Sequence, residues 1–271
     1  DFWRHRGIDR RIAAALSTTI STSSSEMQYA VLRSVKVLVA EDREVAPDLP
    51  VLFCRYDDPV PVKRAKLALL VVLCTAEGLD TVLGELAEYA KEVDGEWAGT
   101  VVVEGMGRLA ERLEAARWPA VQIILGLAAS GVGHLLQAAC IALRSILDRE
   151  EDPHRLYSLD LAVLFDAPLE AIDDPEARGA LVWLAGHFGM HTRRHDRAMA
   201  VVEALVNGDY SNEAGSVQAA LLDASMSMAL HWEALGEDGD AATREAARSL
   251  FQATVKRATN SGSVDLREHA V

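Results

Sequence analysis

Apolar residues recur along this chain at intervals of three and four positions, the spacing that places side chains on one face of an α-helix. One such stripe consists of Met27, Val31, Val35, Leu38 and Val39. Alternating apolar and polar runs, which are typical of β-strands, are scarce. Turn signals separate helical segments of roughly 10 to 20 residues, an ordinary length for globular helices. The pattern therefore predicts an all-α protein.

Taken in pairs, the predicted helices repeat about every 35 to 40 residues, which is the period of HEAT and armadillo repeats. A compact helical bundle has similar stripes, but short connections keep successive helices antiparallel and favour stacking. We therefore expect an α-solenoid of stacked antiparallel helix pairs. No linker or low-complexity segment interrupts the chain, so residues 1–271 are expected to form a single solenoid segment.

Two acid pairs beside prolines predict helix starts. Asp174 precedes Pro175, and a carboxylate before a first-turn proline is a strong capping signal. Asp57 and Asp58 precede Pro59 in the same way. We interpret these carboxylates as helix caps and not as general acids or bases.

Residues 118–143 contain no charged side chain, which raises the question of a membrane span. A span needs about 20 apolar residues in one helix. Here the segment from Ser130 to His134 contains two glycines and breaks the run. We therefore expect two short buried helices.

The charge balance and the cysteines exclude several classes of protein. With 27 basic and 41 acidic residues the net charge is −14, so nucleic acid is not expected as a partner. Cys54, Cys74 and Cys140 lie far apart in apolar segments, which predicts free thiols in a reducing compartment. No phosphate-binding loop or nucleophile motif is present. We expect a protein that is not an enzyme and has no cofactor.

One alternative remains, an all-helical metalloenzyme. His187, His191 and His195 are spaced four residues apart, so on one continuous helix their rings would share a face and could bind zinc. Gly189 and the arginines before His195 argue that the helix ends between them. The favoured interpretation is a histidine-rich helix end without a metal.

Two basic clusters are candidates for contact with an anionic membrane or an acidic partner. The first cluster consists of Arg4, Arg6, Arg10 and Arg11. The second consists of Lys63, Arg64 and Lys66. Most such clusters are solvated helix faces.

The amino-acid sequences of several segments resemble the trunk of the β-adaptins, the large β subunits of clathrin-adaptor complexes. Residues 26–33 (EMQYAVLR) are similar to that family's EVQYVALRN, and residues 86–94 (LAEYAKEVD) to its LKEYATEVD. Residues 56–59 (YDDP), 174–178 (DPEAR) and 265–270 (DLREHA) also have counterparts in the same order. These motifs belong to the middle and late trunk, so the first trunk helices, the hinge and the ear are expected to lie outside this chain.

The resemblance implies a scaffold that binds the medium and small adaptor subunits and a second large adaptin. It implies indirect links to clathrin, cargo tails and a membrane that carries an Arf-family GTPase or phosphoinositide. The expected location is cytoplasmic, on the periphery of Golgi, endosomal or plasma-membrane coated vesicles, in endocytosis and intracellular protein transport. A coatomer-type or other HEAT-repeat transport scaffold is the alternative.

The resemblance also implies two residues in contact with the medium subunit. The β trunk covers the tyrosine-motif pocket of that subunit in the closed family complex. The family's contact positions fall on Val93 and His134. His134 stands where the family has Tyr, and His offers less apolar area.

Overall fold

The computed structural model describes residues 6–91, 101–149, 161–192, 194–208, 210–235, 240–260 and 268. Within these ranges the chain is built from helices and turns without a β-strand, which confirms the prediction of an all-α protein. The contacts group the chain into two compact units, Asp1–Ala120 and Val121–Val271.

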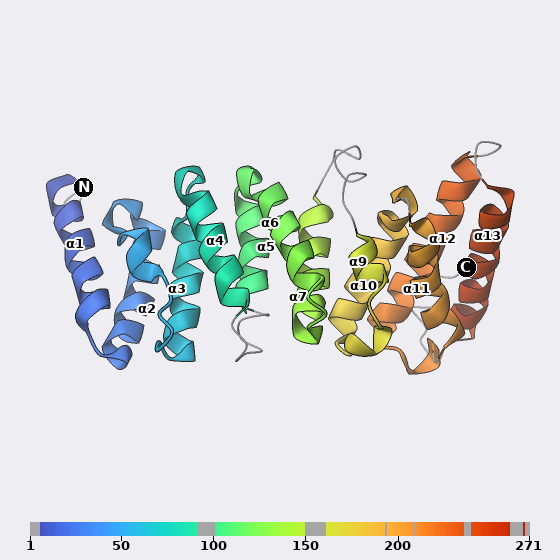
Figure 1. The fold of residues 1–271 in the computed structure, drawn as a ribbon, viewed down its shortest axis with the longest axis horizontal. Coiled ribbons are helices and arrows are strands. Elements are labelled where there is room, and N and C mark those ends of the chain that lie inside the picture. Colours follow the sequence, from blue (N-terminus) through green and yellow to red (C-terminus); the bar gives the residue numbers. More distant parts are fainter. Residues whose placement is uncertain are drawn as a thin grey trace. The chain divides into compact units, whose positions relative to one another are not determined.

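The first unit holds the helices α1 to α5 and the first part of α6. The α-helices are α1 (Arg6–Thr22), α2 (Ser25–Glu41), α3 (Val60–Leu73), α4 (Leu79–Ala90), α5 (Val103–Arg112) and α6 (Glu114–Ala128). The short 3-10 helices are η1 (Arg43–Val45), η2 (Leu49–Leu52) and η3 (Ala76–Gly78). Figure 1 shows successive helices of this unit running up and down beside one another. α2 contacts both α1 and α3, and α5 contacts both α3 and α4, as in helical repeats.

The buried stripe of α2 differs from the predicted one at three of five positions, because Met27 and Leu38 are exposed and Val31 is only half-buried. Gln28, Leu32, Val35 and Val39 are buried, whereas Met27 is 54% exposed. Gln28 is accommodated because its Nε2 donates a hydrogen bond to the backbone oxygen of Ser23, 2.9 Å away. Leu32 and Val35 join the leucines of α3 in the core of the first unit.

Two arginines satisfy the carbonyl groups at the C-terminal end of α3. The Nε of Arg112 donates to the oxygen of Val71 over 3.0 Å, and its Nη2 donates to the oxygen of Cys74. Arg43 donates to the oxygen of Val72, also over 3.0 Å. The last carbonyls of a helix have no partner within the helix, so these contacts tie α5 and η1 to the end of α3.

The uncharged segment forms two helices, as predicted. α6 ends at Ala128, and Gly131 adopts a φ of 74° in the turn before α7 (Gly133–Leu147). A positive φ is easily adopted only by glycine, which explains Gly131 at this turn. Among the helices described, none is both long enough and apolar enough to cross a bilayer.

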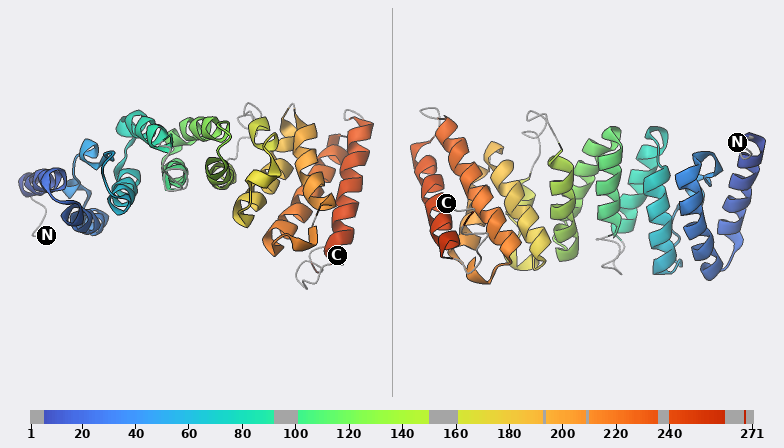
Figure 2. Two further views of the ribbon diagram at one scale, coloured as in Figure 1. Left: turned by 60° about the horizontal axis from the view of Figure 1, so that its bottom comes forward. Right: turned by 180° about the vertical axis from the view of Figure 1, so that it is seen from behind.

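The second unit is centred on α10. Besides α7 its α-helices are α9 (Ala162–Phe165), α10 (Pro175–His187), α11 (His195–Asn207), α12 (Gly215–Leu235) and α13 (Ala241–Thr259). Its 3-10 helices are η5 (Leu169–Ala171), η6 (Gly189–His191) and η7 (Tyr210–Asn212). α10 packs against α7, α11 and α12, and α12 packs in turn against α13 (Figure 2).

The N-terminus of α10 is fixed by two side chains. Asp174 caps the helix as predicted, because its Oδ1 accepts a hydrogen bond from the backbone nitrogen of Glu176 over 3.1 Å. Gln137 on α7 accepts from the nitrogen of Asp174 and donates to the oxygen of Ala171. One amide therefore holds α7, η5 and the start of α10 together.

Candidate functional site

A groove of about 730 Å³ lies between α2 and α3 in the first unit. On α2 it is lined by Tyr29, Arg33, Lys36 and Val37, which follow one another at helical spacing. Val60 and Arg64 face it from α3. We call this surface the α2–α3 groove.

The α2–α3 groove combines apolar surface with positive charge. Tyr29, Val60 and Val37 are 38%, 42% and 64% exposed, which is high for such side chains. Arg33, Lys36 and Arg64 are exposed, and no carboxylate among the described residues pairs with them. The Arg33 guanidinium lies 5.9 Å from the centre of the Tyr29 ring, within the range of a cation–π contact. Such a surface suits an acidic segment that also carries apolar side chains.

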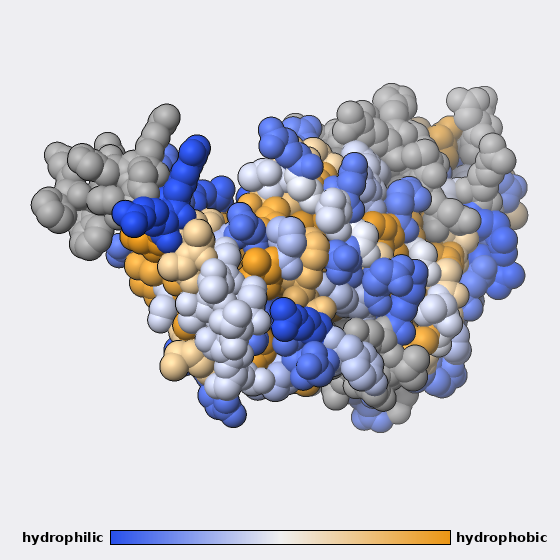
Figure 3. All heavy atoms as spheres, turned by 60° about the vertical axis from the view of Figure 1, so that its left-hand side comes forward, coloured by the Kyte–Doolittle hydropathy of each residue, from blue (hydrophilic) through white to orange (hydrophobic). Residues whose placement is uncertain are grey.

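One face of the chain has a mixed surface. Figure 3 shows hydrophilic residues over much of the side that faces the viewer, with hydrophobic residues in small patches between them. Single exposed apolar residues are normal on a soluble surface. The α2–α3 groove differs because its apolar residues and its cations converge on one hollow.

The predicted cluster of Lys63, Arg64 and Lys66 is split by the fold, and this corrects the prediction. Lys66 is only 2% exposed: its Nζ lies 2.6 Å from Asp58 Oδ2 and 3.3 Å from the backbone oxygen of Phe53. Lys63 is 6% exposed, and its Nζ lies 5.8 Å from the centre of the Tyr56 ring. Only Arg64 is exposed to a partner, because the other two lie on the buried side of α3.

Asp58 is not the cap that the sequence predicted. Pro59 is the N-cap residue of α3, and Asp58 instead accepts hydrogen bonds from Lys66 and from the backbone nitrogen of Arg55. The carboxylate thus holds the turn before α3 against the helix, where its charge is balanced by the lysine.

The two predicted medium-subunit contacts have different outcomes. Val93 lies outside the described residues. His134 is half-buried in the first turn of α7, next to Gly133. Its ring is therefore partly accessible at a helix start of the second unit, and its role stays a prediction.

The three histidines do not share a helix face, so the metal alternative loses its geometric basis. α10 ends at His187, whose ring stacks on Trp183 with centroids 4.5 Å apart. His191 meets His231 edge-on at 4.7 Å, and His195 meets Trp232 at 5.1 Å. No group of three potential ligands able to hold a metal ion occurs within the described ranges.

The cysteines offer no obvious nucleophile. Cys54, Cys74 and Cys140 are free thiols, and the last two are buried. Burial raises the pKa of the Cys140 thiol to about 12 and also raises the pKa of Cys74. A protonated thiol is a poor nucleophile, so Cys74 and Cys140 act as small apolar groups.

The family model for the adaptin N-terminal region matches residues 7–271 of this chain. The chain belongs to the adaptin family. The resemblance to β-adaptins is confirmed by the relatives of this adaptin chain. The human AP-1 complex subunit beta-1 is 31% identical over 222 residues, which is 82% of this chain and 22% of the relative. The Dictyostelium discoideum AP-1 complex subunit beta is 30% identical over 214 residues, 79% of this chain and 22% of the relative.

A further relative is the AP-2 complex subunit beta of Schizosaccharomyces pombe, 29% identical over 174 residues, 64% of this chain and 25% of the relative. The adaptin chain thus spans about a fifth to a quarter of the length of these curated relatives. Its fold is similar to one in a homology model of the full-length AP-3 complex in an intermediate open conformation. The TM-score is 0.66 at 16% identity, and the match covers 97% of this chain and 44% of that chain. This likeness confirms the predicted solenoid fold class.

Sequence reasoning missed Arg33, Lys36 and the groove that they border. The available signal was the helical spacing of Tyr29, Arg33 and Val37, which repeats every four residues opposite the buried stripe. The groove forms only where the exposed face of α2 meets α3, and the spacing within one helix does not predict that contact.

Proposed function

We infer that this adaptin chain is part of the large β subunit of a heterotetrameric adaptor complex and acts as a non-enzymatic scaffold. The observation that carries the proposal is the family match over residues 7–271, together with the three relatives described above, each of which is named as an AP complex beta subunit. Stacked helices supply long surfaces for protein partners, and this architecture suits a subunit that holds others in place.

The proposed partners are a medium subunit, a small subunit and a second large adaptin. Through them the complex would select cargo tails and recruit clathrin, on membranes that carry an Arf-family GTPase or phosphoinositide. The proposed setting is the cytoplasmic surface of Golgi, endosomal or plasma-membrane coated vesicles, where the protein is peripheral. The exposed cations and apolar side chains of the α2–α3 groove support a role in binding an acidic protein segment.

The test of the proposal is affinity purification of the full-length protein with a tag from its own cells. We expect medium and small adaptor subunits to co-purify in stoichiometric amounts. A tagged unrelated helical-repeat protein of similar charge is the control. Recovery of the tagged protein alone, under conditions that preserve other coat complexes, would contradict the proposal.

Within this function, Val93 and His134 are proposed to contact the medium subunit and to cover its tyrosine-motif pocket. A Val93→Glu change would place a charge against an apolar partner surface, which disfavours the closed complex. Binding of a tyrosine-motif peptide to the assembled complex is then expected to become tighter. Peptide affinity equal to that of the unmodified complex would refute the assigned contact.

A further inference from the structure

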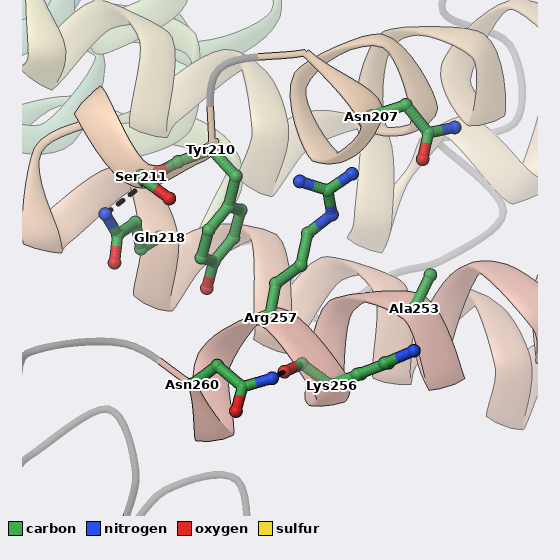
Figure 4. A pocket seen from close by; sticks show the side chains of 8 residues that line it. All are labelled: Asn207, Tyr210, Ser211, Gln218, Ala253, Lys256, Arg257 and Asn260. Carbon is green, nitrogen blue, oxygen red and sulfur yellow. Dashed lines mark hydrogen bonds between the residues drawn. The ribbon is translucent and has the colours of Figure 1, made fainter.

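A second cavity, of about 480 Å³, lies in the second unit beside α13. Tyr210 of η7, Asn207 of α11 and three side chains near the end of α13 line it, namely Lys256, Arg257 and Asn260. We call it the α13 cavity. Figure 4 shows the Tyr210 ring reaching toward α13, while the Arg257 side chain extends from α13 toward Asn207.

The α13 cavity gathers positive charge that the described part of the chain does not neutralise. Lys256 is exposed and Arg257 is half-buried, and neither has a carboxylate partner among the described residues. This differs from Arg248 on the same helix, which pairs with Glu233 and Glu245. In a chain of net charge −14, two cations at one cavity that have no carboxylate partner among the described residues mark a place for an anion.

Tyr210, one of the residues that line the cavity, is almost completely buried. Tyr210 is 2% exposed, and within the described ranges its hydroxyl has no hydrogen-bond partner. Buried hydroxyls are normally paired, because an unpaired one loses its bonds to water without replacement. Burial raises the pKa of Tyr210 although Arg257 opposes this, so the hydroxyl stays protonated and able to donate at neutral pH.

We propose that the α13 cavity binds a phosphate monoester carried by a protein segment, with Arg257 and Lys256 as its cationic ligands. A guanidinium binds two phosphate oxygens at once, and two cations balance the two negative charges of a phosphorylated side chain. Asn207 supplies a neutral amide donor at the same cavity, and Asn260 is partly engaged because its Nδ2 donates to the oxygen of Lys256 over 2.8 Å.

A phosphorylated protein segment fits better than a lipid surface. Two cations match one phosphate, whereas membrane recruitment by charge uses clusters of about four to eight basic residues. The net charge of −14 also opposes approach to an anionic bilayer. The proposal does not depend on the adaptor function, since it rests on the cavity alone.

The test titrates the 271-residue chain with three probes: a short phosphoserine peptide, the same peptide with serine, and the same peptide with glutamate. Affinity is measured by isothermal titration calorimetry, and in the unmodified chain the Nε–H signal of Arg257 in NMR spectra locates the bound probe. We expect the phosphopeptide to bind at least about tenfold more tightly than the serine peptide, as one charge-assisted contact requires. Equal affinity of all three peptides overturns the proposal.

Single substitutions distinguish binding at the α13 cavity from a non-specific effect of positive charge. Arg257→Gln is expected to lower phosphopeptide affinity about tenfold, and Lys256→Gln about threefold, because each removes one cation. Arg248→Gln, a loss of the same charge on the same helix, is the matched control and should leave affinity unchanged. Equal losses in the Arg257 and Arg248 variants overturn the site. The Lys256 variant keeps the test decisive if circular dichroism shows that the Arg257 variant is misfolded.

Two further probes, inorganic phosphate and lipid vesicles, test whether the phosphate that binds belongs to a protein segment. Inorganic phosphate should shift the same Arg257 signal more weakly than the phosphopeptide, since it lacks the flanking peptide contacts. Vesicles of phosphatidylcholine with about 5% phosphatidylinositol 4-phosphate should not bind the chain. Binding to these vesicles without binding to the phosphopeptide would overturn the proposal in favour of a lipid headgroup.

Discussion

Lys66 Nζ lies 2.6 Å from Asp58 Oδ2, and the two side chains are only 3% and 7% exposed. This ion pair joins the turn before α3 to the buried side of that helix. It also explains why the basic cluster predicted from the sequence is not a surface cluster. Removing one partner leaves a buried charge without compensation, so the pair is a sensitive point of the first unit.

Replacing Asp58 by Ala should therefore lower the free energy of unfolding by about 3–5 kcal/mol, the range for a broken buried pair. The double variant Asp58→Ala with Lys66→Met should lose less, because no charge is left unpaired. Urea denaturation measures the free energy of unfolding of both variants. Arg108→Gln breaks an exposed pair with Glu104 and should cost at most about 0.5 kcal/mol. A loss in the Asp58 variant as small as in this control would contradict the structural role.

Two glycines of α10 provide a matched comparison. A Cβ on Gly186 would lie 2.5 Å from Cα and 2.6 Å from Cβ of Ala224, whereas a Cβ on Gly179 meets nothing within 4 Å. Gly186→Ala should push α10 away from α12 and destabilise the second unit by about 1–3 kcal/mol. Gly179→Ala should stabilise it by about 0.5–1 kcal/mol, because alanine is the better helix former. Thermal unfolding that ranks the two variants in the opposite order would refute the close approach of these helices.

The histidine pair of the second unit should make stability depend on pH. Burial lowers the pKa of His191, and burial followed by the charges of His191 and His195 lowers the pKa of His231. The folded state thus binds these protons less readily than the unfolded state, whose value is near 6.5. The stability that the neutral forms of His191 and His231 give to the folded state is fully present above pH 6.5. This stability is lost as the pH falls from 6.5 toward the lowered pKa values of the folded state.

We therefore expect the melting temperature to fall between about pH 7 and about pH 5.5, and to fall less in the His231→Gln variant. NMR titration of the His231 ring should give a midpoint below 6.5. A midpoint of the His231 titration above 6.5 would contradict this assignment of the pH dependence to the histidine pair. Identical melting curves for the unmodified chain and the His231→Gln variant at both pH values would also contradict it.

Charge reversal in the α2–α3 groove should weaken partner binding without unfolding the chain. Arg33→Glu with Arg64→Glu removes two exposed cations and adds two repulsive charges, so affinity for the partner subunits should drop at least about tenfold. Lys91→Glu with Arg108→Glu makes the same charge change elsewhere on exposed residues of the first unit. Surface plasmon resonance against the purified partner subunits compares the two variants. The prediction fails if both pairs have the same effect.

Much of the fold followed from the sequence because helix spacing and breaks are local signals. The helix break at Gly131 and the cap at Asp174 were predicted correctly, since each depends on a few neighbouring residues. The burial of Lys66 was not predictable in this way. It depends on Asp58, eight positions earlier, turning back onto α3 instead of capping it.

The candidate site was harder to predict because it is formed between helices. Arg33 and Arg64 lie 31 positions apart and border one groove only because α2 and α3 pack against each other. The end of α10 was predictable because its signal is local: His187 and His191 are four residues apart, but Gly189 between them indicates that the helix ends there, and it does. Sequence distance predicts contact within a helix and says little about contact between helices.

We propose that this adaptin chain serves as part of a scaffold that holds other subunits. Native mass spectrometry of the full-length protein, co-expressed with a medium subunit, a small subunit and a second large adaptin, measures this directly. We predict one dominant species with one copy of each of the four chains. Spectra in which the full-length protein is found only as a free monomer, while the other subunits assemble without it, would contradict the account.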